Sequence, residues 1–204
     1  MEPVVAAFDV DGTLTVRDCV VPFLFRVGGL RGVLRAMSRP ALVVGALWRR
    51  DRDQLKAHFV RSFLAGVPQS VLDARGEDFA RRVASSWMRA DVAARLRRHQ
   101  DEGHVVLLVS ASLDPYLVPL GEMLEVDAVL CTRVEFVDEI ATGELTGANC
   151  RGAEKVARLR EWGLRAGLSG DAWLSFAYGD SAGDREMLAL ATEGHNVSRS
   201  EVAA

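Results

Sequence analysis

The chain has 204 residues, of which 49% are hydrophobic and 26% charged, enough for one core plus a modest insertion. Its 25 basic residues against 28 acidic ones give no excess of positive charge, so we expect no nucleic-acid partner. The three cysteines, Cys19, Cys131 and Cys150, form no C-x-x-C pair and predict reduced thiols rather than disulfides or a zinc site.

The sequence contains no signal for membrane insertion or export. Its longest apolar run, Ala41 to Trp48, is well short of the roughly 18 residues that span a bilayer. Glu2 and Asp9 bracket a short apolar run at the N-terminus, which lacks the basic start of a signal peptide. We therefore expect a cytoplasmic protein.

The first predicted element is a buried parallel strand over Val4–Val10, an apolar run that leads into acid and glycine. Similar runs follow over His104–Ser110, Ala128–Phe136, Trp173–Asp180 and, more weakly, His195–Ser198. Segments with helical spacing lie between these runs, and the alternation predicts an α/β fold. We expect a doubly wound, Rossmann-like parallel sheet that binds ligands at the carboxyl ends of its strands.

Residues 17–84 interrupt this alternation, because they show helical periodicity without a strand-like run. They predict a small α-helical cap inserted after the first strand, and residues 1–16 and 85–204 form the predicted core. Between Arg17 and Ser62 there are ten basic residues and three acidic ones, or +7, which leaves −10 for the rest of the chain. This asymmetry favours contact with an anionic ligand or surface, or arginines that only solvate amphipathic helices.

Two smaller features complete the predicted organisation. Glycine and threonine in Thr142–Gly147 predict a tight hairpin turn after the third strand. The four histidines lack ligand spacing, and we expect them at the surface or at strand edges.

The segment Asp9-Val10-Asp11-Gly12-Thr13 sets two carboxylates close together at the end of a strand. Acids so close repel unless a positive charge lies between them, and Mg²⁺ takes one or two carboxylates plus phosphate and water. The segment lacks the further acids of a calcium loop.

Three later segments add groups that suit a phosphate ester. Ser110-Ala111-Ser112 offers hydroxyl and backbone N–H groups at a predicted strand-to-helix turn, where serine is also a common helix cap. Lys155 lies near a helix start, where the helix dipole disfavours a cation. Asp180 and Asp184, in the segment GDSAGD, suit a metal, although Asp184 also suits a helix cap.

Taken together, DVDGT, VSAS, GAEK and GDSAGD resemble the four motifs of the haloacid dehalogenase superfamily of aspartyl phosphohydrolases, over about Val4 to Leu190. A helical insertion between the first two motifs is similar to subfamily IB, which contains phosphoserine phosphatases and phosphatidylglycerophosphatase C-like proteins. The resemblance implies a phosphatase that hydrolyses phosphomonoesters.

The resemblance also implies the role of each motif residue. Asp9 is expected to be the nucleophile that forms an aspartyl-phosphate, and Asp11 the general acid and base. Mg²⁺ is the expected cofactor, held by Asp9, the backbone carbonyl of Asp11 and Asp180, with Asp184 supporting these groups.

The same resemblance assigns binding of the substrate phosphate to Ser110, the Ala111 N–H group and Lys155. A phosphotransferase or phosphomutase that uses the same intermediate stays an alternative. A non-catalytic binding module is less favoured because no motif residue is missing.

Substrate selection is expected in the cap. Alignment on the motifs places Asp18 and Arg61 near the cap residues with which phosphoserine phosphatases grip serine, but neither matches fully, which disfavours phosphoserine. We expect a small-molecule phosphate ester, from a soluble metabolite or a lipid head group. The apolar, Arg-flanked stretch Leu30–Arg50 leaves peripheral membrane contact open, although packing on neighbouring helices is favoured, and we infer no obligate protein partner.

Overall fold

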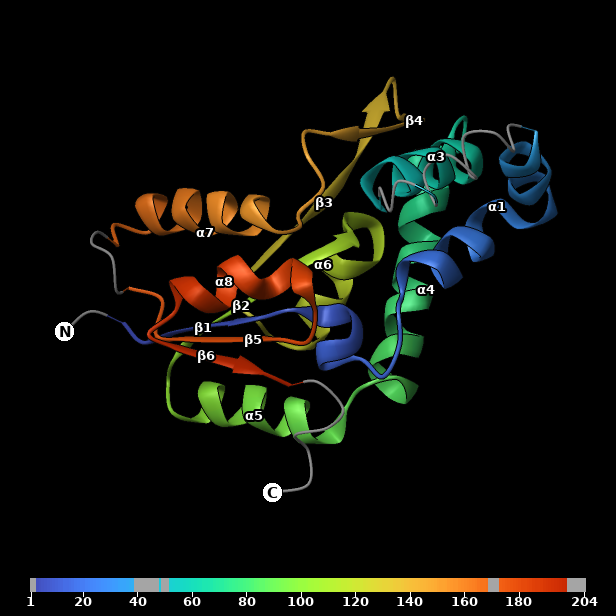
Figure 1. Ribbon diagram of the computed structural model, residues 1–204. Coiled ribbons are helices and arrows are strands. Elements are labelled where there is room, and N and C mark those ends of the chain that lie inside the picture. Colours follow the sequence, from blue (N-terminus) through green and yellow to red (C-terminus); the bar gives the residue numbers. More distant parts are fainter. Residues whose placement is uncertain (1–2, 39–47, 49–51, 169–172, 198–204) are drawn as a thin grey trace.

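A computed structural model describes residues 3–38, 48, 52–168 and 173–197 (Figure 1). In this part of the chain six strands form one sheet in the order β4-β3-β2-β1-β5-β6. The strands are β1 (Val5–Phe8), β2 (Val105–Leu113), β3 (Ala128–Val137), β4 (Ile140–Thr146), β5 (Phe176–Gly179) and β6 (Glu193–Asn196). Neighbouring strands run parallel except β4, which is antiparallel to β3 at one edge.

Helices cover both faces of the sheet, which explains why the strands read as continuous apolar runs. Ala6 and Phe8 of β1 face one hydrophobic cluster, and Val5 and Ala7 face the other. The first cluster includes α5 and α6, and the second includes α7 and α8 (Figure 1). These helices are α5 (Ala90–Asp101), α6 (Asp114–Met123), α7 (Ala153–Arg165) and α8 (Arg185–Leu190). The predicted doubly wound sheet is confirmed.

The chain between β1 and α5 is helical where the structure describes it. It contains α1 (Val20–Met37), α3 (Arg52–Leu64) and α4 (Gln69–Ser86), which lie together beyond one end of the sheet (Figure 1). Helix α1 packs on α3, and α4 packs on α6. A helical insertion after the first strand is therefore confirmed, and the exact cap boundaries stay a prediction.

The hairpin turn predicted over Thr142–Gly147 is wrong. Those residues belong largely to β4, and the reversal occurs at Asp138 and Glu139, which take left-handed φ angles of 49° and 62°. Gly143 lies inside the strand instead, where an added Cβ atom would come within 2.9 Å of the Cα atom of Arg61 on α3. The glycine permits close packing of α3 on the hairpin rather than a turn.

The prediction for the histidines is wrong for His99. This side chain is only 7% exposed, because α5 presents it to the sheet rather than to solvent. Its Nε2 atom lies 3.0 Å from the hydroxyl oxygen of Tyr178, and its Nδ1 atom lies 2.8 Å from Nδ1 of His104.

Two predictions concern residues near the gap in the described chain. The run Ala41–Trp48 lies almost wholly outside the described residues. Within Leu30–Arg50, Val33 and Ala36 of α1 pack in the core, as favoured, whereas the side chains of Leu30, Leu34 and Met37 are exposed. No helix in the described ranges is long and apolar enough to cross a membrane.

Candidate active site

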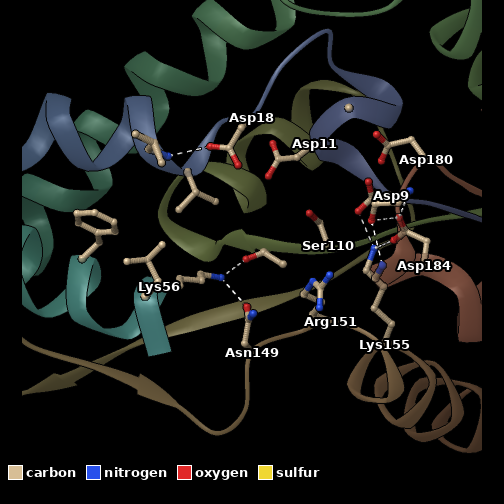
Figure 2. Close-up of a pocket in the computed structure, with 18 of the residues that line it drawn as sticks. Asp9, Asp11, Asp18, Lys56, Ser110, Asn149, Arg151, Lys155, Asp180 and Asp184 are labelled. Atoms are coloured by element: carbon tan, nitrogen blue, oxygen red, sulfur yellow. Dashed lines mark hydrogen bonds and ion pairs between the residues drawn. The ribbon is translucent and has the colours of Figure 1, made fainter. Parts of the chain in front are cut away.

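A pocket of about 460 Å³ lies where the carboxyl ends of β1, β2 and β5 meet the helices that follow β1 (Figure 2). Because β1 is flanked by β2 and β5, the groups at the ends of these three strands converge. Asp9 follows β1, Ser110 belongs to β2, and Asp180 follows β5. All three line the pocket, as the sequence predicted.

Asp9 and Lys155 form the buried centre of this pocket. The Lys155 Nζ atom lies 2.6 Å from Oδ1 of Asp9 and 2.6 Å from Oδ1 of Asp184. Burial would lower the pKa of Lys155, but the two carboxylates reverse this effect and raise it. Burial likewise raises the pKa of Asp9 to about 7, although Lys155 opposes the shift.

Asp11 is held apart from this buried group. Its Oδ1 accepts a hydrogen bond of 2.9 Å from the Cys19 backbone N–H group, and its Oδ2 accepts one of 2.7 Å from the Ser112 hydroxyl. Burial, with a smaller contribution from the charge of Asp18, raises the pKa of Asp11 to about 6. A carboxyl group with such a pKa can both donate and accept a proton near neutral pH.

The predicted strand-to-helix turn at Ser110–Ser112 is wrong in its local structure, because β2 continues to Leu113 and α6 begins at Asp114. The pairing of β2 with β3 shifts register between Ser110 and Leu113, so the strand end is irregular. The hydroxyl oxygen of buried Ser110 accepts the Ser112 N–H group at 3.1 Å. The groups predicted to bind phosphate therefore lie on an irregular strand.

Carboxylates suited to a cation gather beside this strand. Asp9, Asp180 and Asp184 each offer an oxygen, and these atoms lie within 4.8 Å of one another. Gly12, with a φ of 85°, leaves the space that Asp180 occupies, since a Cβ atom there would overlap its carboxylate. Burial, and then the charge of Asp184, raise the pKa of Asp180, although a hydrogen bond from Thr13 and the charge of Lys155 oppose the shift. The donor set of hard oxygens therefore fits a divalent cation such as Mg²⁺.

The two residues proposed for substrate selection are placed differently. Asp18 lines the pocket and also accepts the Val21 N–H group at 3.0 Å, so it caps the start of α1. Arg61 does not line the pocket, and its guanidinium pairs with Glu144 of β4. Lys56 instead extends from α3 into the pocket. The two positions differ by five residues, or about 140° around the helix.

Lys56 is a pocket residue that the sequence analysis missed. Its ammonium group donates to the Ala111 carbonyl oxygen and to Oδ1 of Asn149 at 2.6 Å (Figure 2). It also donates to Oγ1 of Thr132 at 3.2 Å. Burial lowers its pKa to about 8. A compositional signal could have found it, because the chain has only two lysines, Lys56 and Lys155, among its 25 basic residues.

Asn149 and Arg151 also line the pocket and were not singled out from the sequence. Asn149 links two parts of the chain, because its side chain accepts from Lys56 and donates to Oδ1 of Asp53 at 2.6 Å. Asn149 and Arg151 precede α7 in an irregular segment, where periodicity gives no signal.

Comparison with known proteins supports the fold and identifies the family. The chain is 40% identical to the protein CicA of Caulobacter vibrioides over 207 aligned residues, covering 99% of this chain and 90% of CicA. A crystal structure of a protein of unknown function from Bordetella pertussis Tohama I superposes with a TM-score of 0.75 at 24% identity, covering 93% of this chain and 87% of that one.

A phosphoserine phosphatase solved as an analogue of its phospho-aspartyl intermediate shares the fold, with a TM-score of 0.64 and 20% identity over 94% of this chain and 84% of its own. The family model for haloacid dehalogenase-like hydrolases matches residues 6–189. The resemblance carried by the four motifs is thus confirmed, and this chain belongs to the haloacid dehalogenase-like hydrolase family.

Proposed function

We propose that this chain is a Mg²⁺-dependent phosphatase that hydrolyses phosphomonoesters through an aspartyl-phosphate on Asp9. The observation that carries the proposal is the separation of two carboxylates at the end of β1. Asp9 lies against Lys155, and Asp11 is held by Cys19 and Ser112 with a raised pKa. A nucleophile and a separate general acid are what this reaction requires.

In the first step a carboxylate oxygen of Asp9 attacks phosphorus, and the bond from phosphorus to the ester oxygen breaks. Protonated Asp11 donates its proton to the leaving oxygen, which departs as an alcohol. In the second step ionised Asp11 takes a proton from water, whose oxygen attacks phosphorus and releases Asp9 and inorganic phosphate. Asp11 is protonated again at the end of the cycle.

Ser110, the Ala111 N–H group and Lys155 are the proposed ligands of the phosphoryl oxygens. Lys155 is oriented by Asp9 and Asp184 and carries the positive charge closest to the nucleophile. When bound by Asp9, the Asp11 carbonyl and Asp180, Mg²⁺ supplies charge that neutralises the phosphoryl oxygens and favours ionised Asp9. Asp184 accepts from the N–H and hydroxyl groups of Ser181, at 3.0 and 2.7 Å, and fixes this loop.

The proposed substrate is a phosphate ester of a small metabolite or a lipid head group. Val20, Leu24, Leu55 and Phe59 line the pocket on the side of the helical insertion and suit the carbon skeleton of such an ester. We propose that residues 17–84 act as the cap, and that the enzyme works in the cytoplasm.

The test is phosphate release from a panel of phosphomonoesters, including phosphoserine and phosphatidylglycerophosphate, with and without Mg²⁺. Asp9→Asn is compared with Asp101→Asn, a control at an exposed position on α5. We expect Mg²⁺-dependent release that Asp9→Asn abolishes and Asp101→Asn retains. Incorporation of ¹⁸O from labelled water into phosphate separates hydrolysis from transfer to an alcohol.

Two results would contradict the proposal. Mg²⁺-dependent release that persists in Asp9→Asn would remove Asp9 as the nucleophile. Formation of a new ester with an added alcohol, without ¹⁸O incorporation, would favour the phosphotransferase alternative.

A further inference from the structure

The pocket is lined by three basic side chains that differ in the partners of their charged groups. Lys155 is paired with two carboxylates, and Lys56 donates to three neutral oxygens. The guanidinium of Arg151 makes no hydrogen bond and no ion pair with any residue in the described part of the chain. None of the five side-chain N–H groups of Arg151 therefore has an acceptor among the described residues.

The position of Arg151 is fixed by its surroundings. Its backbone N–H group donates to the Asn149 carbonyl at 2.7 Å, and its own carbonyl accepts from the Glu154 N–H group at 3.2 Å. Its side chain lies along Gly183, where an added Cβ atom would be 2.9 Å from Nε and 3.3 Å from Cζ. Figure 2 shows the guanidinium between Asn149 and Lys155, directed toward Ser110. An arginine held in this way is ready to receive an anion.

The reacting phosphoryl group already has its proposed ligands in Ser110, the Ala111 N–H group and Lys155. A planar guanidinium binds carboxylate or phosphate with two parallel hydrogen bonds, which a lone positive charge does not do. Lys56 adds a second positive charge to the same pocket, and its three hydrogen-bond acceptors among the described residues are all neutral oxygens. Arg151 and Lys56 therefore suit a second anionic group of the substrate better than a further contact to the reacting phosphoryl group.

We propose that Arg151 determines specificity by binding a second anionic group of the substrate, a carboxylate or a further phosphate close to the ester carbon. The inference rests on the proposed function, because it assumes that a phosphate ester occupies the pocket. It narrows the substrate class to phosphate esters with two anionic groups.

The binding test uses phosphonates, which resist hydrolysis. Calorimetry with Mg²⁺ present compares methylphosphonate, with one anionic group, against phosphonoacetate and 1,3-propanediphosphonate, which have two. We expect at least one of the latter to bind the native protein about tenfold more tightly than methylphosphonate. The preference between them distinguishes a carboxylate from a second phosphate.

Variants at position 151 show whether this preference depends on the guanidinium. Arg151→Gln should remove the preference and leave methylphosphonate binding within about twofold, and Arg151→Lys should retain only part of it. Arg160→Gln, at an exposed position on α7, is the matched control and should retain all of it. Equal binding of all phosphonates by the native protein, or an equal loss for all in Arg151→Gln, overturns the proposal.

Turnover provides a separate readout. Arg151→Gln should raise KM for phosphoglycolate about tenfold and leave KM for ethyl phosphate nearly unchanged, since these esters differ by one carboxylate. A KM that rises equally for both esters overturns the role in specificity. If no ester is hydrolysed, the proposed function fails, and the phosphonate preference still decides whether Arg151 binds a second anion.

Discussion

Lys155 is unfavourable in its own helix but is stabilised by contacts outside it. It lies in the first turn of α7, where the helix dipole disfavours a cation, and is 1% exposed. Its two ion pairs with Asp9 and Asp184 offset both costs. A buried ion pair adds little stability compared with an apolar pair of similar size. Removal of one partner nevertheless costs stability, because the other charge stays buried without its partner.

We therefore predict that Lys155→Met lowers the free energy of unfolding by about 3 kcal/mol and abolishes turnover. Urea denaturation measures the loss, and Arg160→Met on the exposed side of α7 is the control. Added Mg²⁺ should recover part of the lost stability, because the variant leaves Asp9 and Asp184 without their cation. An unchanged urea midpoint would contradict the structural role assigned to Lys155.

His99 makes stability depend on pH. Burial, and then the neighbouring His104, lower its pKa, so the folded protein favours the neutral ring. The two Nδ1 atoms at 2.8 Å also require one ring to donate and the other to accept. Since the folded pKa is depressed, the stabilisation is present above the unfolded value of about 6.5 and is lost as pH falls through the folded pKa.

Other charged groups also affect how stability depends on pH. Arg98 and His195 also lower the pKa of His99, and Glu102 opposes them. The pKa values of Asp9 and Asp11 are raised in the folded protein, so their contribution to the free energy of unfolding grows as pH falls. We therefore predict that the stability difference between native protein and His99→Gln narrows from pH 7.5 to about pH 5. If urea denaturation gives the same stability difference between the native protein and His99→Gln at every pH, titration of His99 is not the cause.

At the scale of elements, the contact between α4 and α6 depends on one glycine. A Cβ atom at Gly76 of α4 would overlap the carbonyl of Pro115 in the first turn of α6. Because both partners are backbone, the helices must separate to accept a larger residue. This contact joins the helical insertion to the core, so its loss should destabilise both the insertion and the core.

We predict that Gly76→Ala lowers the free energy of unfolding by about 1–3 kcal/mol, although alanine is the better helix former. Arg82→Ala, at an exposed position on the same helix, should change it by less than about 0.5 kcal/mol. Thermal and urea denaturation of both variants measure the effect. Stabilisation by Gly76→Ala would mean that helix propensity outweighs the close approach.

At the scale of the whole molecule, the pocket brings together acids from two separate parts of the chain. Asp9, Asp180 and Asp184 come from β1 and from the loop after β5, so a cation among them links distant parts of the chain. Such a cation binds the folded state and not the unfolded one, and it stabilises the fold by mass action.

Mg²⁺ at about 100 times its Kd should therefore raise the free energy of unfolding by about 2.7 kcal/mol, seen as a higher Tm. Asp180→Asn should reduce this shift strongly, and Asp101→Asn should keep it. An equal Mg²⁺ effect in native protein and Asp180→Asn would place the stabilising ion elsewhere.

The sequence by itself determined the α/β class, because strands buried on both faces must be apolar throughout and the helices between them must show one apolar side. It also predicted that Asp9, Ser110 and Asp180 lie at the carboxyl ends of strands, and the adjacency of β1, β2 and β5 in the structure brings them to one edge. The hairpin turn was misplaced, because Asp138 and Glu139 adopt left-handed angles that glycine usually takes.

Only the tertiary structure decided which side chains of the insertion enter the pocket. Lys56 rather than Arg61 does so, because the packing of α3 on α1 and the hairpin sets the rotation of the helix. The burial of His99 and the placement of the Arg151 guanidinium in the pocket likewise depend on residues far away in the sequence. Helical periodicity shows that a face is buried, but the partner across it is fixed only when distant elements pack together.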